Sequence, residues 1–326
     1  MNNVTRIGYL DGWRGLAIML VLIGHFMPIA YLNLGRFGVE LFFVLSGRLM
    51  ADILFIQKTS LKRFYWRRFS RIYPTLILFL ITCTFLYPNS WPYSPSTIKA
   101  IAAATLTINY LHSAGYGTPF FDHIWSLCIE EHMYVLLGVL ALAIGNKNSK
   151  AYYFIFFIAA LMIGSGIISS VLLDMNYYQT YWRSDVRGAG ILIGCGLQIY
   201  RQRMPQIEKF VDSKRIVIAL VLSLIFSLSP IPDFLKYSIG TCSLAFVIVF
   251  LHKAPNYMLT ILQSKCMRIV GAASFSLYIW QQPFFITKLL LPNGTAFVLS
   301  VILGFLSFYF FEQPVRRLLN RHEAKI

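Results

Sequence analysis

A histidine and an arginine lie inside an apolar run near the amino terminus of the chain. The run from Leu10 to Phe26 has Arg14 near its start and His25 near its end. At 100° and 1.5 Å per residue, a helix would place both side chains on one face, about 16 Å apart. An ionisable side chain at membrane depth costs at least about 2.5 kcal/mol, so it normally faces a bundle interior or a water-filled cavity. Both residues are therefore candidates for function.

Three glutamates occur in similar apolar surroundings. Glu40 lies in the run GVELFFVLSG, and Glu130 and Glu131 precede His132 in another apolar segment. If the first two helices run in opposite directions, Glu40 reaches about the depth of His25 and could orient it as a general base. The alternative for Glu40 is that it only snorkels to the outer surface. For Glu130 and Glu131, catalysis and a structural hydrogen-bond network are both open.

Basic and aromatic residues alternate in the stretch LKRFYWRRFSRIYP, residues 61–74. Arg68 and Arg71 are three residues apart, so a helix would put them on one face, where they could grip phosphate groups bidentately. A nucleotide-bearing cosubstrate such as coenzyme A needs a site of this kind. The alternative is an interfacial anchor for anionic lipid. We expect Pro74 to begin the third membrane helix.

Other charged motifs indicate structural roles. Arg48 and Asp52 are four residues apart, so we expect them to neutralise each other on one helix face. The motif FEQPVRR begins at Phe311. Here we expect Pro314 to end the last membrane helix and the following arginines to anchor it at the inner surface.

The composition indicates a membrane protein. Of 326 residues, 57% are hydrophobic and only 13% are charged, and the mean hydropathy is +0.62, which is too apolar for a soluble domain. The net charge of +16 comes from basic clusters between apolar runs, which is the positive-inside pattern and argues against nucleic acid as a partner. The five cysteines have no CxxC spacing, and we predict neither a disulfide framework nor a metal site.

The apolar segments predict an all-α polytopic membrane protein with about ten transmembrane helices. The predicted spans are 12–31, 38–56, 73–88, 123–145, 151–173, 187–201, 214–230, 236–252, 268–290 and 295–312. The stretch 97–111 is also apolar, but a crossing there would place the basic cluster 201–215 outside, against the positive-inside rule. We therefore expect both termini to be cytoplasmic, and residues 1–326 to form a single transmembrane domain without an appended soluble domain.

Taken together, these motifs resemble the acyltransferase-3 family of integral membrane acyltransferases over essentially the full chain. The markers occur in the family's order and are LDG leading to Arg14 and His25, the GVELFFVLSG run, Arg68 and Arg71 before Pro74, WSL followed by Glu130 and Glu131, the SLYIW run and the final EQPVRR. The sequence departs from the family pattern at His132, Met133 and Gln281, the last standing where many members carry histidine.

The resemblance implies that an acyl group, usually acetyl, passes from cytoplasmic acyl-coenzyme A to a hydroxyl of a cell-surface or lipid-linked glycan at the bacterial inner membrane. The family's motif implies that His25 is the general base or a transient acyl carrier. The resemblance implies that four further residues bind or position the acyl-coenzyme A donor, namely Asp11, Arg14, Arg68 and Arg71. It also implies that Glu130 and Glu131 are the family's acidic pair. Acyl-coenzyme A would be a cosubstrate, with no permanently bound cofactor or metal.

Two other functions fit the same residues. A transporter or flippase could use the intramembrane arginine, histidine and glutamates as a proton or substrate path. An acyltransferase of this family could also act on a cytoplasmic small molecule. Binding of acyl-coenzyme A separates the transporter from the enzyme, because a transporter would not need it.

Overall fold

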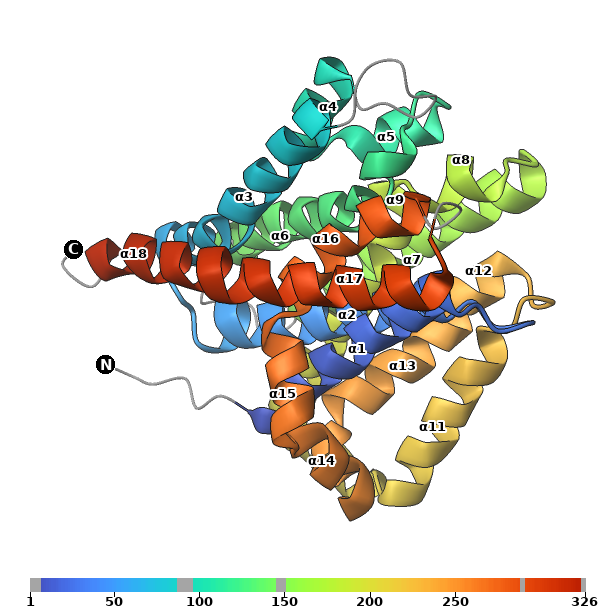
Figure 1. Ribbon diagram of the computed structural model, residues 1–326. Coiled ribbons are helices and arrows are strands. Elements are labelled where there is room, and N and C mark those ends of the chain that lie inside the picture. Colours follow the sequence, from blue (N-terminus) through green and yellow to red (C-terminus); the bar gives the residue numbers. More distant parts are fainter. Residues whose placement is uncertain (1–6, 87–95, 145–150, 288–290, 324–326) are drawn as a thin grey trace.

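The protein is an assembly of helices, as predicted. The computed structural model describes residues 7–86, 96–144, 151–287 and 291–323, and within these ranges the chain forms no β-strand. The first turn of the first helix and the last turn of the last helix lie toward the same side of the bundle (Figure 1). Residues 1–6 and 324–326 lie outside the described ranges, so the cytoplasmic position of both termini stays a prediction.

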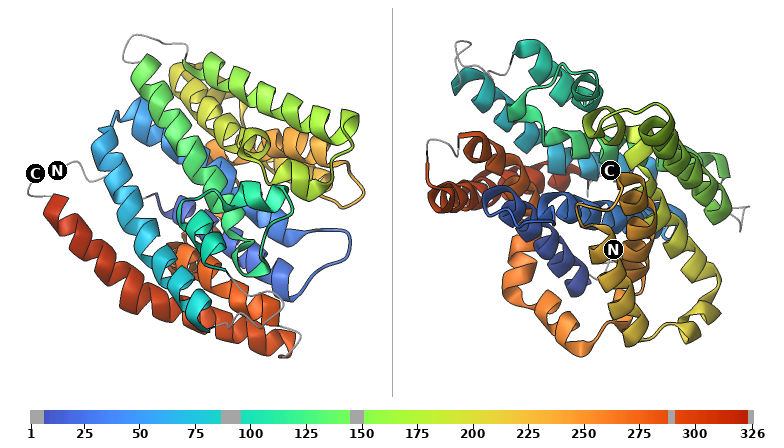
Figure 2. Two further views of the ribbon diagram at one scale, coloured as in Figure 1. Left: turned by 90° about the horizontal axis from the view of Figure 1, so that it is seen from above. Right: turned by 90° about the vertical axis from the view of Figure 1, so that its right-hand side faces the viewer.

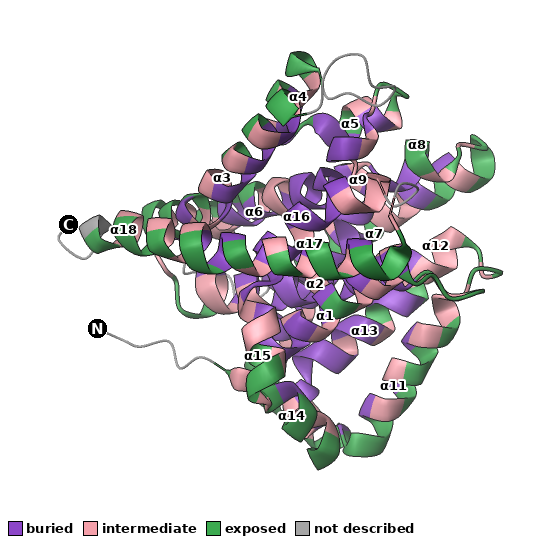
Figure 3. Cartoon of the chain, in the orientation of Figure 1, coloured by how far each residue is buried: buried purple, intermediate pink, exposed green. Residues whose placement is uncertain are grey.

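The centre of the bundle is a hairpin of α1 (Gly8–Phe26) and α2 (Leu34–Met50). Buried residues concentrate around this hairpin, whereas the outer helices are largely exposed (Figure 3). The helices that pack most extensively against the hairpin are α10 (Ala189–Arg203), α13 (Thr241–Val249), α14 (Asn256–Gln263), α15 (Lys265–Ala272) and α16 (Ser274–Ile286). The apolar run that carries Arg14 and His25 is therefore in the interior of the fold.

Small residues allow α2 and α10 to touch through their backbones. A Cβ atom on Gly47 of α2 would lie only 1.9 Å from the carbonyl oxygen of Ile191, and one on Gly194 of α10 would lie 2.4 Å from that of Val44. Real side chains do not fit at such distances, so glycine is required at both positions. Small residues at these positions let the two helices pack closely.

Four helical stretches are long and apolar enough to span a membrane. They are α3 (Leu61–Leu86), α6 (Ile124–Ile144), Ala151–Leu172, which joins α7 (Ala151–Ile167) to η4 (Ile168–Leu172), and Asn293–Arg321, which runs through α17 (Asn293–Ser307), η9 (Phe308–Glu312) and most of α18 (Gln313–Glu323). Large apolar side chains on these stretches are exposed, for example Phe85 at 82%, Leu142 at 69% and Phe310 at 77%. Exposed apolar faces of this size suit lipid and not water. The protein is a membrane protein, and the number of ten spans stays a prediction.

Residues 97–111 do not form one spanning helix. They form α4 (Thr97–Ala104) and α5 (Ile108–Ser113), separated at Leu106, whose φ is +58°. Since α4 has eight residues, it is only about 12 Å long, far less than the bilayer core of about 30 Å. This break agrees with the prediction that the stretch does not cross.

Two expectations about prolines were wrong. Helix α3 begins at Leu61 and runs through Pro74, and the last helical stretch continues past Pro314 into α18. Both exceptions are explained by packing, because α3 and α18 lie side by side (Figure 2), with the indole of Trp66 donating to the carbonyl of Leu319 at 3.4 Å. At Pro314 the preceding π-helical turn η9 also changes the local backbone spacing, so the helix continues where a regular α-helix would be interrupted.

Shorter elements connect the main helices at the two ends of the bundle. These are η1 (Ala51–Ile56), η2 (Pro119–Phe121), α8 (Tyr177–Tyr181), α9 (Ser184–Arg187), η5 (Pro205–Phe210), α11 (Ser213–Phe226), α12 (Asp233–Leu235), η6 (Lys236–Gly240) and η7 (Leu251–Lys253).

Candidate active site

His25 lies in the last turn of α1 and is held by two residues of α16. Its Nδ1 atom is 2.8 Å from Oε1 of Gln281, and its ring stacks on Phe285 with the centroids 4.5 Å apart. With the amide oxygen facing Nδ1, that nitrogen carries the hydrogen and donates it. In that tautomer the lone pair of the imidazole lies on Nε2.

A glycine of α2 leaves space beside Nε2. A Cβ atom on Gly35 would lie 3.3 Å from Nε2 of His25. Next to it, a Cβ on Gly24 would lie 2.2 Å from the backbone nitrogen of Gly35, so α1 and α2 touch directly at this point. The two glycines bring α2 close to the imidazole without placing a side chain against Nε2.

Glu40 has a different partner from the one predicted. Its carboxylate forms an ion pair with Arg187 of α9 and accepts a hydrogen bond from Oγ1 of Thr241 at 2.8 Å. Glu40 and Arg187 are both buried, with 6% and 2% exposure. The expectation that Glu40 orients His25 is therefore corrected, because a buried carboxylate is stabilised most by a cation, and Gln281 takes the position at Nδ1. A catalytic role for Glu40 itself stays a prediction.

The acidic pair of α6 is joined to α3 by a single arginine. Arg68 donates from Nε to Glu131 at 2.6 Å and from Nη2 to Glu130 at 2.8 Å. Ser46 of α2 donates a further hydrogen bond to Glu130, and the guanidinium of Arg68 lies 4.0 Å above the ring centre of Tyr134. This network connects α2, α3 and α6. Arg68, which the sequence motif suggests as a phosphate-binding residue, thus binds both carboxylates.

Arg14, Arg71 and Asp11 form a second charged group, nearer the start of α1. Nη1 of Arg14 is 3.7 Å from Oδ1 of Asp11, and its guanidinium interacts electrostatically with Arg71 and Arg68 of α3. Among the residues that the structure describes, Arg71 forms no ion pair. The two arginines of the motif therefore differ. Arg68 forms ion pairs with two carboxylates, whereas Arg71 forms none among the described residues.

A cavity of about 280 Å³ adjoins the same end of α1. Asp11 lines it together with the cations Lys265 and Arg268 of α15 and the aromatic residues Phe308 and Tyr309. Basic groups beside aromatic surface are suited to an anionic group attached to a planar ring.

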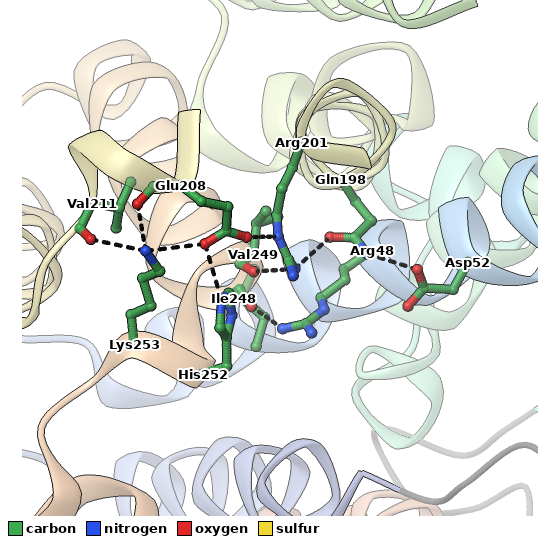
Figure 4. Close-up of polar contacts among 10 residues, drawn as sticks. All are labelled: Arg48, Asp52, Gln198, Arg201, Glu208, Val211, Ile248, Val249, His252 and Lys253. Carbon is green, nitrogen blue, oxygen red and sulfur yellow. Dashed lines mark hydrogen bonds and ion pairs between the residues drawn. The ribbon is translucent and has the colours of Figure 1, made fainter. Parts of the chain in front are cut away.

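A separate polar cluster joins α2, α10, η5 and η7 (Figure 4). Arg48 donates to the carbonyl of Ile248, and Asp52 accepts from Nε2 of Gln198 at 2.7 Å. The expected pairing of Arg48 with Asp52 is thus replaced by bonds to other helices.

Glu208 is the acidic centre of this cluster. It receives a hydrogen bond from Arg201 at 2.6 Å and lies 3.2 Å from both Lys253 and Nε2 of His252. Burial raises the pKa of Glu208, but the hydrogen bonds from Arg201 and Lys253 outweigh it and lower the pKa to about 2. These contacts link the ends of several helices, and we call the group the clamp. Its charged and polar members are Arg48, Asp52, Gln198, Arg201, Glu208, His252 and Lys253.

A half-buried histidine at one end of a central helix and cations near its other end are an arrangement that a membrane-embedded group-transfer enzyme could use. The chain belongs to the acyltransferase-3 family, since the family model described as an acyltransferase domain matches residues 7–311. The family expected from the sequence motifs is confirmed.

Two relatives are O-acetyltransferases by name. The peptidoglycan O-acetyltransferase OatA of Listeria monocytogenes is 27% identical over 369 residues, which cover 97% of this chain and 58% of the relative. The O-acetyltransferase OatA of Staphylococcus aureus strain NCTC 8325 is 27% identical over 350 residues, covering 94% of this chain and 57% of the relative. The chain therefore spans less than two thirds of these relatives. No solved structure matches it.

Sequence reasoning did not assign Gln281 and Arg187 to the site. In the sequence Gln281 marks only a departure from the family pattern, and no local spacing links Arg187 to its partner Glu40. A long-range partner leaves no local spacing signal, because α1 and α16 meet only in the folded bundle.

Proposed function

We propose that the protein transfers an acetyl group from cytoplasmic acetyl-coenzyme A to a hydroxyl of an extracytoplasmic glycan, as a multi-pass protein of the bacterial inner membrane. The observation that carries the proposal is the hydrogen bond of Nδ1 of His25 to Gln281, which leaves Nε2 as a base beside Gly35. The family match and the names of the two relatives support glycan O-acetylation. Peptidoglycan is the first acceptor to test, since one relative is named for it.

In this proposal His25 moves one proton. Nε2 takes the proton of the acceptor hydroxyl while its oxygen attacks the carbonyl carbon of the thioester. The carbon–sulfur bond then breaks, the new ester forms, and His25 returns the proton to the sulfur of coenzyme A. General-base catalysis of this kind contributes about 10²- to 10⁴-fold to the rate.

The anionic part of the donor is assigned to the opposite end of α1. Arg71 forms no ion pair among the described residues, and Lys265 and Arg268 line the cavity beside Asp11. The fourteen residues from Asp11 to His25 correspond to about 21 Å of helix. The donor's phosphates and its thioester would thus lie at different depths of the bundle, with Asp11 keeping Arg14 in place.

The first experiment measures label from acetyl-coenzyme A in the glycan fraction of membranes carrying the protein. We expect label that mild base releases as acetate, and we expect its loss in His25→Ala at unchanged protein level. His252→Gln is the matched control, because it removes a histidine of the clamp and keeps a side chain that can bond to Glu208. Full transfer by His25→Ala would refute the mechanism.

A second experiment tests the donor site. Arg71→Gln is expected to raise the KM for acetyl-coenzyme A by about tenfold, the effect of losing one charge-assisted hydrogen bond, without changing the acceptor KM. Lys62→Gln removes one charge from an exposed position of the same helix and serves as control. If the wild-type protein neither binds acetyl-coenzyme A nor labels any fraction, the enzyme proposal fails and transport becomes the better hypothesis.

A further inference from the structure

A second cavity, of about 200 Å³, adjoins the end of the α1–α2 hairpin that carries His25. It lies between α2, the turn at 227–229, η6 and α13. Its polar lining residues include Asn33, Arg36, Glu40, Tyr237 and Thr241. The acyl-transfer steps above assign no role to this cavity.

The cavity is a near neighbour of the base. The position that a Cβ atom on Gly35 would take is 3.3 Å from Nε2 of His25 and 3.4 Å from Oδ1 of Asn33. Asn33 lines the cavity. The small space beside Gly35 is therefore all that separates the cavity lining from Nε2 of His25. A ligand held in the cavity could therefore present one of its groups to Nε2.

The floor of the cavity is a rigid polar surface. Glu40 lines it and is fixed by the ion pair with Arg187 and the hydrogen bond from Thr241. A buried ion pair is expensive to desolvate and contributes little net stability. Here it fixes the Glu40 carboxylate in the cavity lining. Arg36, at the cavity's edge, stacks on Tyr177 at 3.6 Å and forms no ion pair within the described parts of the chain.

One polar group in the lining has no partner. Tyr237 is only 8% exposed, and its hydroxyl makes no hydrogen bond to any described residue. Its ring is held in place by Arg187, whose guanidinium carbon is 3.6 Å from the ring centre, and by the ring of Tyr181 at 4.7 Å. A buried hydroxyl without a partner is costly. Because Tyr237 also lines the cavity, a ligand bound there could supply the missing partner.

We propose that this cavity binds the sugar unit of the acceptor glycan and presents its hydroxyl to His25, an inference that rests on the proposed function. A sugar offers hydroxyls that both donate and accept, and the lining complements them, with Glu40 as acceptor, the Tyr237 hydroxyl as donor and the Asn33 amide as either. The volume is below the usual range for drug-sized ligands, which suits a single ring at the end of a longer chain.

The test uses Tyr237→Phe in the full-length protein, with a disaccharide fragment of peptidoglycan as acceptor and saturating acetyl-coenzyme A. Removing only the hydroxyl should raise the acceptor KM about 3- to 10-fold, the effect of one hydrogen bond to the ligand, with the donor KM unchanged. The melting temperature should not fall, because the lost hydroxyl has no partner in the protein. Tyr181→Phe is the matched control.

Tyr181 suits this purpose because its hydroxyl is also buried and unpartnered among the described residues, it packs against the same ring, and it does not line the cavity. A raised acceptor KM in Tyr237→Phe but not in Tyr181→Phe supports the cavity as the acceptor site. An active wild-type enzyme whose acceptor KM is the same in Tyr237→Phe overturns the cavity and leaves the proposed function standing. A wild-type protein that acetylates no glycan overturns both.

Discussion

The amide oxygen of Gln281 lies 2.8 Å from Nδ1 of His25, although the two residues are 256 positions apart in the chain. This contact connects α1 to α16 and favours the tautomer with its lone pair on Nε2, the nitrogen that we propose as the base. Gln281 is completely buried, so the side chain is held in one orientation by its surroundings. We regard Gln281 as a positioning residue for His25.

The first prediction concerns this contact. Gln281→Leu removes the acceptor at Nδ1 with little change in volume, so we expect kcat to fall about 10- to 100-fold, corresponding to the loss of one buried hydrogen bond. Gln281→Glu retains an oxygen that can accept from Nδ1 and should recover part of the rate. Both variants are assayed for acetyl transfer under saturating substrates. A wild-type kcat in Gln281→Leu would contradict the assignment.

The second prediction concerns the space beside Nε2. Gly35→Ala adds a methyl group 3.3 Å from Nε2 of His25, which is tight but sterically possible. We expect at least a tenfold loss of transfer with a stability change of no more than about 1 kcal/mol, since a helical glycine-to-alanine change usually favours the fold. The control is Gly164→Ala in α7, where the added methyl has no neighbour within 4 Å. Equal transfer rates in the two variants would show that access to Nε2 is not needed.

The third prediction concerns the network of α3 and α6. Arg68→Ala leaves Glu130 and Glu131 without their cation in a largely buried site, so we expect a loss of about 3 kcal/mol in folding stability. Replacing both glutamates by glutamine in the same protein should restore much of the melting temperature, because no unpaired charge then remains. Thermal unfolding in detergent measures both effects. An unchanged melting temperature in Arg68→Ala would show that the network is not structural.

The fourth prediction concerns acid stability of the clamp in Figure 4. Because the pKa of Glu208 is lowered to about 2 in the fold but lies at about 4.3 in an unfolded chain, its stabilisation is complete above about pH 5. It is lost as the pH falls toward 2.

We therefore expect the melting temperature to decrease as the pH is lowered from 7 to 3. Glu208→Gln should melt at a lower temperature than wild type at pH 7 but lose less between pH 5 and pH 3. Asp174→Asn, which removes an exposed carboxylate, is the control and should follow the wild-type curve. Parallel pH curves for Glu208→Gln and wild type would contradict the role of this carboxylate.

Composition and motif order were sufficient to predict a helical membrane protein and its family. Both depend on local properties of the chain, because apolar runs of sufficient length form helices in a membrane wherever their partners are. The placement of His25 and Arg14 inside the bundle followed from the same reasoning, since an ionisable group in an apolar run must avoid lipid.

Only the tertiary structure decided the partners of the charged residues. Glu40 was expected at His25 from their similar depth, but depth does not specify the direction of a side chain, and Arg187 offers a full charge. Likewise, Arg68 and Arg71 look equivalent in the sequence, yet Glu130 and Glu131 bind only the first of them. The prolines at 74 and 314 interrupt a helix in isolation, but the packing of α3 against α18 stabilises both helices through them. Local chemistry determined which residues are available, and the long-range packing of helices selected which of them meet.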